Sequence, residues 1–98
     1  MTTLTADGYT TGTVNARGVK LTIKSKPADK TKERLQVVTK YMYNGRNLMS
    51  VAYKNGSYWV RDYNGRAVVR RDSVKDANAV ARNYTLEMID NAIKDRRL

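Results

Sequence analysis

Apolar and polar residues alternate through residues 46–71, and two Asn-Gly pairs interrupt the alternation. Asn-Gly favours a type I′ hairpin turn, because both central residues of that turn need a positive φ. If Asn55-Gly56 and Asn64-Gly65 are both two-residue turns, the cross-strand register is fixed. The predicted partners are Lys54 with Ser57, Tyr53 with Tyr58, Ala52 with Trp59, Val51 with Val60, Tyr63 with Arg66, Asp62 with Ala67, Arg61 with Val68, Val60 with Val69 and Trp59 with Arg70.

This register predicts a sheet with two unlike faces, because side chains alternate along a strand. The face predicted to join the core carries Met49, Val51, Tyr53, Tyr58, Val60, Ala67 and Val69. The face predicted to be solvated carries Ser50, Ala52, Lys54, Ser57, Trp59, Arg61, Tyr63, Arg66 and Arg70. The second face mixes basic, small and aromatic residues, which suits contact with a polyanion.

The N-terminal part of the chain predicts a hairpin over residues 9–24 and a basic linker over residues 25–32. In residues 19–24 the apolar residues alternate with Lys20, Thr22 and Lys24. Residues 33–43 have apolar residues at both helical and strand spacing. The β-prone run Val37-Val38-Thr39 and a third Asn-Gly pair at Asn44-Gly45 favour a strand. Residues 33–71 are therefore predicted to form a meander.

A helix is predicted over residues 73–97. Ser73 is a good N-cap, with Asp76 three residues later. The predicted apolar stripe is Ala77, Val80, Ala81, Tyr84, Met88 and Ala92, widened by Leu86, Ile89 and Ile93. We expect this stripe to cover Met49, Val51, Val60 and Val69. The predicted fold is α+β: an antiparallel meander of three to four strands plus an N-terminal hairpin, packed on one C-terminal helix in a single domain of residues 1–98.

Composition narrows the function. The 98 residues include no Cys and no His, which removes the commonest metal ligands and the usual general base. The glycines are scattered rather than gathered into a phosphate loop, so we expect no cofactor, no metal and no enzymatic activity. With neither a signal peptide nor an apolar stretch of membrane-spanning length, a cytoplasmic protein without a membrane partner is expected.

The chain has 19 Lys and Arg against 9 Asp and Glu, and a formal net charge of +10. Most of the excess lies in residues 19–65, within the predicted sheet. Such a charge indicates an acidic partner: nucleic acid first, an acidic protein surface second and anionic lipid third.

The candidate nucleic-acid-binding residues are Lys54, Trp59, Arg61, Tyr63, Arg66 and Arg70. Arg can fork to guanine or to phosphate, and Trp can stack on a base or pack on a sugar. A three-stranded sheet is narrow enough to enter a major groove. The alternative is that the N-terminal hairpin covers this face and closes a small barrel, with Trp59 and Val68 in its core.

The run from Val51 to Trp59, then Val60-Arg61, Asn64-Gly65-Arg66 and Asp72-Ser73 with Ala77, resembles the Apetala-type (ethylene-response-factor) DNA-binding domain. That domain also occurs in mobile homing endonucleases, and the arm-binding domain of tyrosine-recombinase integrases shares its plan. The resemblance spans residues 46–93. It implies three antiparallel strands on one helix and DNA contacts from Trp59, Arg61, Arg66 and Arg70, with Lys54 near the first turn. The chain departs from the family pattern at Ser50, where a Gly is usual, and at Arg71, near a usual aromatic. Its first 40 residues have no counterpart.

The first functional hypothesis is a non-enzymatic module that docks on duplex DNA. The second is a protein-interaction module, an inhibitor or adaptor of the kind common on mobile elements, whose basic surface meets an acidic protein. A third is RNA binding through the same face. The oligomeric state is left open by the sequence.

Overall fold

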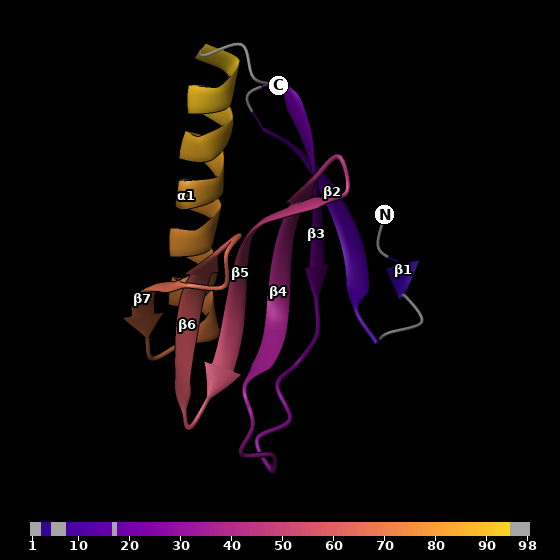
Figure 1. The fold of residues 1–98 in the computed structure, drawn as a ribbon. Coiled ribbons are helices and arrows are strands. Elements are labelled where there is room, and N and C mark those ends of the chain that lie inside the picture. The colour runs from indigo at the N-terminus through magenta and orange to yellow at the C-terminus, as the bar shows by residue number, and fades with distance from the viewer. Residues whose placement is uncertain (1–2, 5–7, 17, 95–98) are drawn as a thin grey trace.

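The computed structural model describes residues 3–4, 8–16 and 18–94, and Figure 1 shows their arrangement. The elements in chain order are β1 (Thr3–Leu4), β2 (Thr10–Ala16), β3 (Val19–Ser25), β4 (Gln36–Tyr43), β5 (Arg46–Lys54), β6 (Ser57–Asp62), β7 (Ala67–Arg71) and α1 (Val74–Lys94). Residues 33–43 contribute a strand, as predicted. The predicted end of the helix at residue 97 lies outside the described residues.

All seven strands form one antiparallel sheet in which spatial order follows chain order. The α+β class, with one C-terminal helix packed on the sheet, is confirmed. The sheet is wider than predicted, because the hairpin β2–β3 pairs edge to edge with β4 and β1 adds a short outer strand. The small-barrel alternative is therefore wrong for the described strands: β2 and β3 extend the sheet and do not fold over β6 (Figure 1).

Two of the three Asn-Gly turns have the predicted form. At Asn55-Gly56 the φ angles are 51° and 80°, and at Asn44-Gly45 they are 50° and 79°. Positive φ at both central residues is the requirement of a type I′ turn. Lys54 pairs with Ser57 across the first of these turns, so the predicted register of β5 and β6 is confirmed.

The turn at Asn64-Gly65 is different, and its predicted two-residue form is wrong. Only Gly65 has a positive φ there, 81°, and the Asp62 amide donates to the Arg66 carbonyl at 2.9 Å. The loop is thus three residues long, a type I turn followed by a left-handed glycine. The Asp62 carboxylate favours it by accepting the backbone N–H groups of Asn64 and Arg66, at 2.9 and 3.0 Å.

This extra loop residue changes the pairing beyond the turn. Arg61 pairs with Ala67 rather than with Val68, and a bulge next to Arg61 restores the predicted pairs of Val60 with Val69 and Trp59 with Arg70. Ala67 is exposed, which corrects its predicted place in the core.

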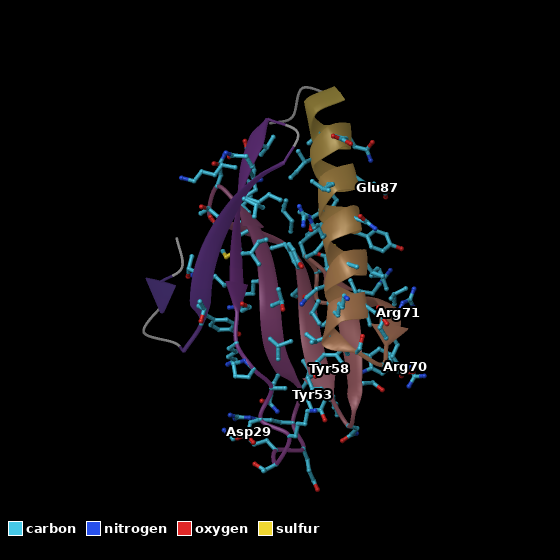
Figure 2. The ribbon with its side chains drawn as sticks, turned by 180° about the vertical axis from the view of Figure 1, so that it is seen from behind. Asp29, Tyr53, Tyr58, Arg70, Arg71 and Glu87 are labelled. Carbon is cyan, nitrogen blue, oxygen red and sulfur yellow. The ribbon has the colours of Figure 1, made fainter. Side chains whose placement is uncertain are left out.

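The core lies between α1 and one face of the sheet. Its buried members are Val38, Tyr41, Met49, Val51, Tyr53, Val60, Ala77 and Ala81, with Val69 packed against them. The Tyr41 hydroxyl donates to the Asn78 carbonyl at 3.1 Å, which ties β4 to the helix. The rings of Tyr53 and Tyr58 lie 5.0 Å apart near the lower end of the helix (Figure 2).

The helix begins as predicted but turns a slightly different side to the sheet. The Ser73 hydroxyl accepts the Asp76 amide at 3.1 Å, an N-cap contact. Among the helix side chains that the structure describes, residues 74–92, the fully buried ones are Ala77, Ala81, Thr85 and Ile89, one every turn. Tyr84, predicted in the stripe, is 39% exposed. Thr85 takes the inner position because its hydroxyl donates to the Ala81 carbonyl at 2.8 Å.

Candidate nucleic-acid interface

The face of the sheet turned away from α1 is called the open face here. Met49, Val51 and Tyr53 pack against the helix, so alternation places Ser50 and Ala52 on the opposite side. Their cross-strand partners Lys40, Arg61 and Trp59 share that side. Among the elements of residues 3–4, 8–16 and 18–94, no helix or second sheet lies over this face.

Register aligns basic residues in one line across the open face. Lys24 of β3 pairs with Lys40 of β4, Lys40 pairs with Ser50 of β5, and Ser50 pairs with Arg61 of β6. We call Lys24, Lys40, Ser50 and Arg61 the cationic row. Two lysines directly opposite each other repel, an arrangement that destabilises a sheet by a few tenths of a kcal/mol up to about 1 kcal/mol. A bound anion would relieve that repulsion.

A second line runs parallel to the cationic row. Ala52 lies between Val37 and Trp59, and Trp59 lies between Ala52 and Arg70. Ala52 is fully buried between its larger partners, although no other described helix or strand covers the face. The prediction that Ser50, Ala52 and Ser57 are solvated is wrong: they are 4%, 0% and 9% exposed. Trp59 itself is half-buried.

The guanidinium groups at this end of the face are held by the fold. The Nε of Arg61 donates to the Gly65 carbonyl at 3.0 Å, which leaves its two terminal nitrogens for another acceptor. The Nη1 of Arg70 donates to the Ser57 hydroxyl at 3.1 Å. Such anchoring lowers the entropy lost when a guanidinium group binds an anion.

The structure places the six candidate residues along the edge of the sheet formed by β5, β6 and β7, three on the strands near the open face and three in or beside the two connecting turns. Trp59 and Arg70 are direct partners, and Arg61 lies one line away in the cationic row. Tyr63, 64% exposed, and the exposed Arg66 belong to the β6–β7 loop. Lys54 is exposed at the β5–β6 turn, opposite Ser57.

Sequence reasoning missed Lys24, Lys40 and Lys26 as members of the same surface. The alternation of residues 19–24 placed Lys20 and Lys24 on one side of a strand, and that signal was correct. It could not give the pairing of Lys24 with Lys40, because the two strands are joined by a long loop rather than a tight turn.

Basic residues outnumber acidic ones in the strands, whereas the two kinds are balanced in α1. The basic residues of the strands are Lys20, Lys24, Lys40, Arg46, Lys54, Arg61, Arg70 and Arg71. Within the strands of the described residues, Asp62 is the only acidic residue, and its carboxylate binds its own loop. In the rest of the described chain, acidic residues lie in the β3–β4 loop or in and just before α1, including Glu87 on the outer side of the helix (Figure 2). The open face therefore has a strong positive potential.

The described part of the chain contains no group of three or more His, Cys, Asp or Glu side chains placed to hold a metal ion. Within the same residues, no helix is long and apolar enough to cross a membrane. No protein-family model, curated protein or solved structure matches the chain. The likeness to the Apetala-type domain thus stays a prediction.

Proposed function

We propose that this protein is a non-enzymatic DNA-binding module that holds duplex DNA on its open face. The observation that supports this most strongly is the cationic row, in which Lys24, Lys40 and Arg61 stand on a surface without a carboxylate among the described strand residues that point to it. Half-buried Trp59, beside Arg70, adds an apolar contact for a sugar.

The width of the sheet decides how DNA docks. Strands lie about 4.8 Å apart, so seven strands span ~29 Å, whereas a major groove is about 12 Å wide. The whole sheet cannot enter a groove. The edge hairpin β6–β7 can, as a two-stranded ribbon with Tyr63 and Arg66 at its tip. Lys24 and Lys40 then lie against the phosphates beside the groove.

Two other partners remain as alternatives. Single-stranded RNA needs aromatic rings on which successive bases stack. Trp59 is only partly accessible on the open face, and the ring of Tyr9 is 5% exposed, which makes a poor stacking platform. An acidic protein could use the same positive charge, but it would gain little from a row of lysines on a flat sheet without an exposed apolar centre.

The test is a fluorescence-polarisation titration of a labelled duplex of about 20 base pairs, which exceeds the ~29 Å of the sheet at 3.4 Å per base pair. The variant Lys24→Gln/Arg61→Gln removes two charges from the cationic row. The matched control, Lys75→Gln/Arg82→Gln, removes one Lys and one Arg from exposed positions of α1. Titrations between about 50 and 200 mM salt give the slope of log K against log salt.

The wild type and the control should bind with the same steep slope. The row variant should bind more weakly, with a slope smaller by about 1.8, because each lost phosphate contact removes about 0.9. Equal weakening by both double variants would mean that only net charge matters and would contradict docking on the open face. Competition of the labelled duplex DNA with duplex RNA, with single strands and with a nuclease-treated lysate ranks DNA, RNA and protein as partners.

A further inference from the structure

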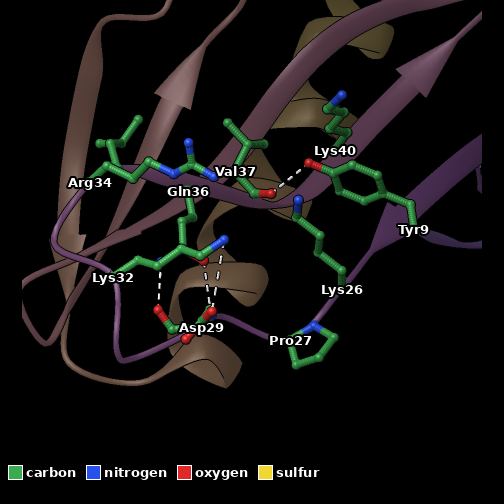
Figure 3. A pocket seen from close by; sticks show the side chains of 10 residues that line it. Tyr9, Lys26, Pro27, Asp29, Lys32, Arg34, Gln36, Val37 and Lys40 are labelled. Carbon is green, nitrogen blue, oxygen red and sulfur yellow. Dashed lines mark hydrogen bonds and ion pairs between the residues drawn. The ribbon is translucent and has the colours of Figure 1, made fainter. Parts of the chain in front are cut away.

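A pocket lies at the end of the open face where β2, β3 and β4 meet the β3–β4 loop, next to the cationic row through Lys40. Its volume is about 470 Å³. The side chains that line it are drawn in Figure 3 and belong to Tyr9, Lys26, Pro27, Asp29, Lys32, Arg34, Leu35, Gln36, Val37 and Lys40. We call this the loop pocket.

The charge inside the loop pocket is poorly balanced. Lys26, Lys32, Arg34 and Lys40 line it, and Asp29 is the only carboxylate among them. Asp29 already accepts the Thr31 hydroxyl at 2.6 Å and the Thr31 amide at 3.0 Å. Those hydrogen bonds, the hydroxyl first, hold the pKa of Asp29 below its ordinary value, so it is ionised at neutral pH.

Asp29 lies closest to one of the four cations. Its Oδ2 is 3.9 Å from Lys32 Nζ, and the nearby charge of Arg34 also helps to lower the pKa of Asp29. Among the described residues that line the pocket, a single carboxylate thus faces four positive charges. That concentration of charge favours an anion of more than one negative charge.

The walls of the loop pocket are held in place before any ligand arrives. The side-chain amide of Gln36 makes two hydrogen bonds to the loop: its oxygen accepts from the Asp29 N–H at 2.9 Å, and its nitrogen donates to the Asp29 carbonyl at 2.7 Å. On the other wall the Tyr9 hydroxyl donates to the Val37 carbonyl at 2.6 Å (Figure 3). A preformed site binds more tightly because less order must be created on binding.

Tyr9 keeps two of the cations close together without neutralising them. The ammonium groups of Lys26 and Lys40 lie 4.6 and 4.7 Å from the centre of its ring. The negative face of an aromatic ring attracts a cation, yet it leaves the N–H donors of the ammonium free to bind an oxyanion. Tyr9 as a whole is 5% exposed, so its ring supports the lysines and is not a stacking surface.

We infer that the loop pocket is a phosphate site, in which Lys26, Arg34 and Lys40 bind phosphate oxygens. This inference rests on the proposed function for the source of the phosphate, which we take to be the backbone of the DNA that crosses the open face. Lys40 belongs to both the cationic row and the loop pocket, so one strand of phosphates can run from Arg61 across to Arg34. A free phosphorylated compound has the same chemistry and is tested separately.

The experiment uses Lys26→Gln/Arg34→Gln, which changes two residues outside the cationic row, with Lys75→Gln/Arg82→Gln as the charge-matched control. Duplex titrations at several salt concentrations are run as above. The salt slope of the loop-pocket variant should fall by about 1.8 relative to the control. In parallel, ¹⁵N-labelled wild type and both variants are titrated with inorganic pyrophosphate without DNA, and the amide shifts of residues 26–40 are followed.

The outcomes separate the two proposals. If duplex binding depends on Lys24 and Arg61 but the loop-pocket variant binds with the affinity and slope of the control, the phosphate site is overturned and the proposed function stands. A different outcome is that neither the wild type nor any variant binds DNA. In that case, amide shifts that saturate with pyrophosphate and disappear only in the loop-pocket variant support a site for a free phosphorylated compound. Absence of both DNA binding and those shifts overturns the phosphate site together with the proposed function.

Discussion

Replacement of Gly65 by Ala tests the loop that holds Arg61. Gly65 has a φ of +81°, and an added Cβ would lie 2.9 Å from Arg61 Nη2. The left-handed conformation costs a residue with a Cβ about 1–2 kcal/mol. The clash adds little, because the end of the arginine side chain can move aside. We therefore expect the free energy of unfolding to fall by about 1–2 kcal/mol.

Two other glycines separate the backbone cost from the side-chain effect. Gly56 has nearly the same φ, +80°, but nothing lies within 4 Å of its added Cβ. Gly12 has neither a positive φ nor a neighbour within 4 Å. Gly56→Ala should lose about as much stability as Gly65→Ala, whereas Gly12→Ala should be unchanged or gain up to about 1 kcal/mol. Urea unfolding measures all three, and each kcal/mol lowers the melting temperature by about 4–8 °C.

Duplex binding distinguishes the two destabilised variants. Gly65→Ala displaces the guanidinium of Arg61 from the Gly65 carbonyl and should weaken DNA binding, while Gly56→Ala should bind like the wild type. If Gly65→Ala were as stable as Gly12→Ala, the conformation described for the β6–β7 loop would be wrong. If it bound DNA as tightly as Gly56→Ala, the anchored position of Arg61 would have no part in binding.

Three further predictions concern the helix and its contact with the sheet. Ser73→Ala should lower the free energy of unfolding by about 1 kcal/mol through loss of the N-cap, and Ser73→Asp should retain it, as measured by urea unfolding. In the same assay Ile89→Ala should cost about 2–5 kcal/mol, because Ile89 is fully buried, whereas Tyr84→Ala should change stability by less than about 0.5 kcal/mol. Burial raises the pKa of Tyr41, outweighing an opposing effect of Arg82. The unfolded chain therefore releases this proton first as the pH rises, so its contribution to stability is complete below about pH 10 and is lost above it. Tyr41→Phe should flatten that alkaline decline in melting temperature; an unchanged decline would assign it to other groups.

Sequence was most informative where structure is decided locally. Asn55-Gly56 specifies its own turn through two positive φ angles, and the register of β5 and β6 follows from it. Ser73 specifies the start of α1 in the same local way. At Asn64-Gly65 the same dipeptide gave a different turn, because the carboxylate of Asp62 two residues earlier binds the loop amides. A prediction based on the Asn-Gly dipeptide alone does not take this carboxylate into account.

The prediction for the buried side of α1 placed Tyr84 inward, but the structure buries its neighbour Thr85 instead. Periodicity counts Tyr84 as apolar and Thr85 as polar. Thr85 can nevertheless be buried, because its hydroxyl donates to the Ala81 carbonyl of its own helix, whereas Tyr84 is partly exposed. The small Ala77 and Ala81, correctly assigned to the core, let the helix approach the sheet.

Only part of the candidate site could be predicted from the sequence. Trp59, Arg61 and Arg70 come together through a local turn and could be placed in advance. Lys24 and Lys40 come together only through pairing of β3 with β4, which depends on how the N-terminal hairpin joins the sheet. Edge-to-edge addition and covering of the open face are both compatible with the alternation of residues 19–24. Long-range packing decides between these two arrangements. The cationic row forms only when the hairpin adds edge to edge.

Trp59 is the only tryptophan of the chain, so its fluorescence reports directly on the open face. The most direct test is a titration of the wild type with unlabelled duplex DNA while tryptophan emission and its quenching by iodide are recorded. We predict a saturable change in emission and reduced quenching at low salt, both reversed at about 1 M salt, where charges are screened within about 3 Å. Duplex binding detected by polarisation with no change at Trp59, or no duplex binding at low salt, would contradict the account.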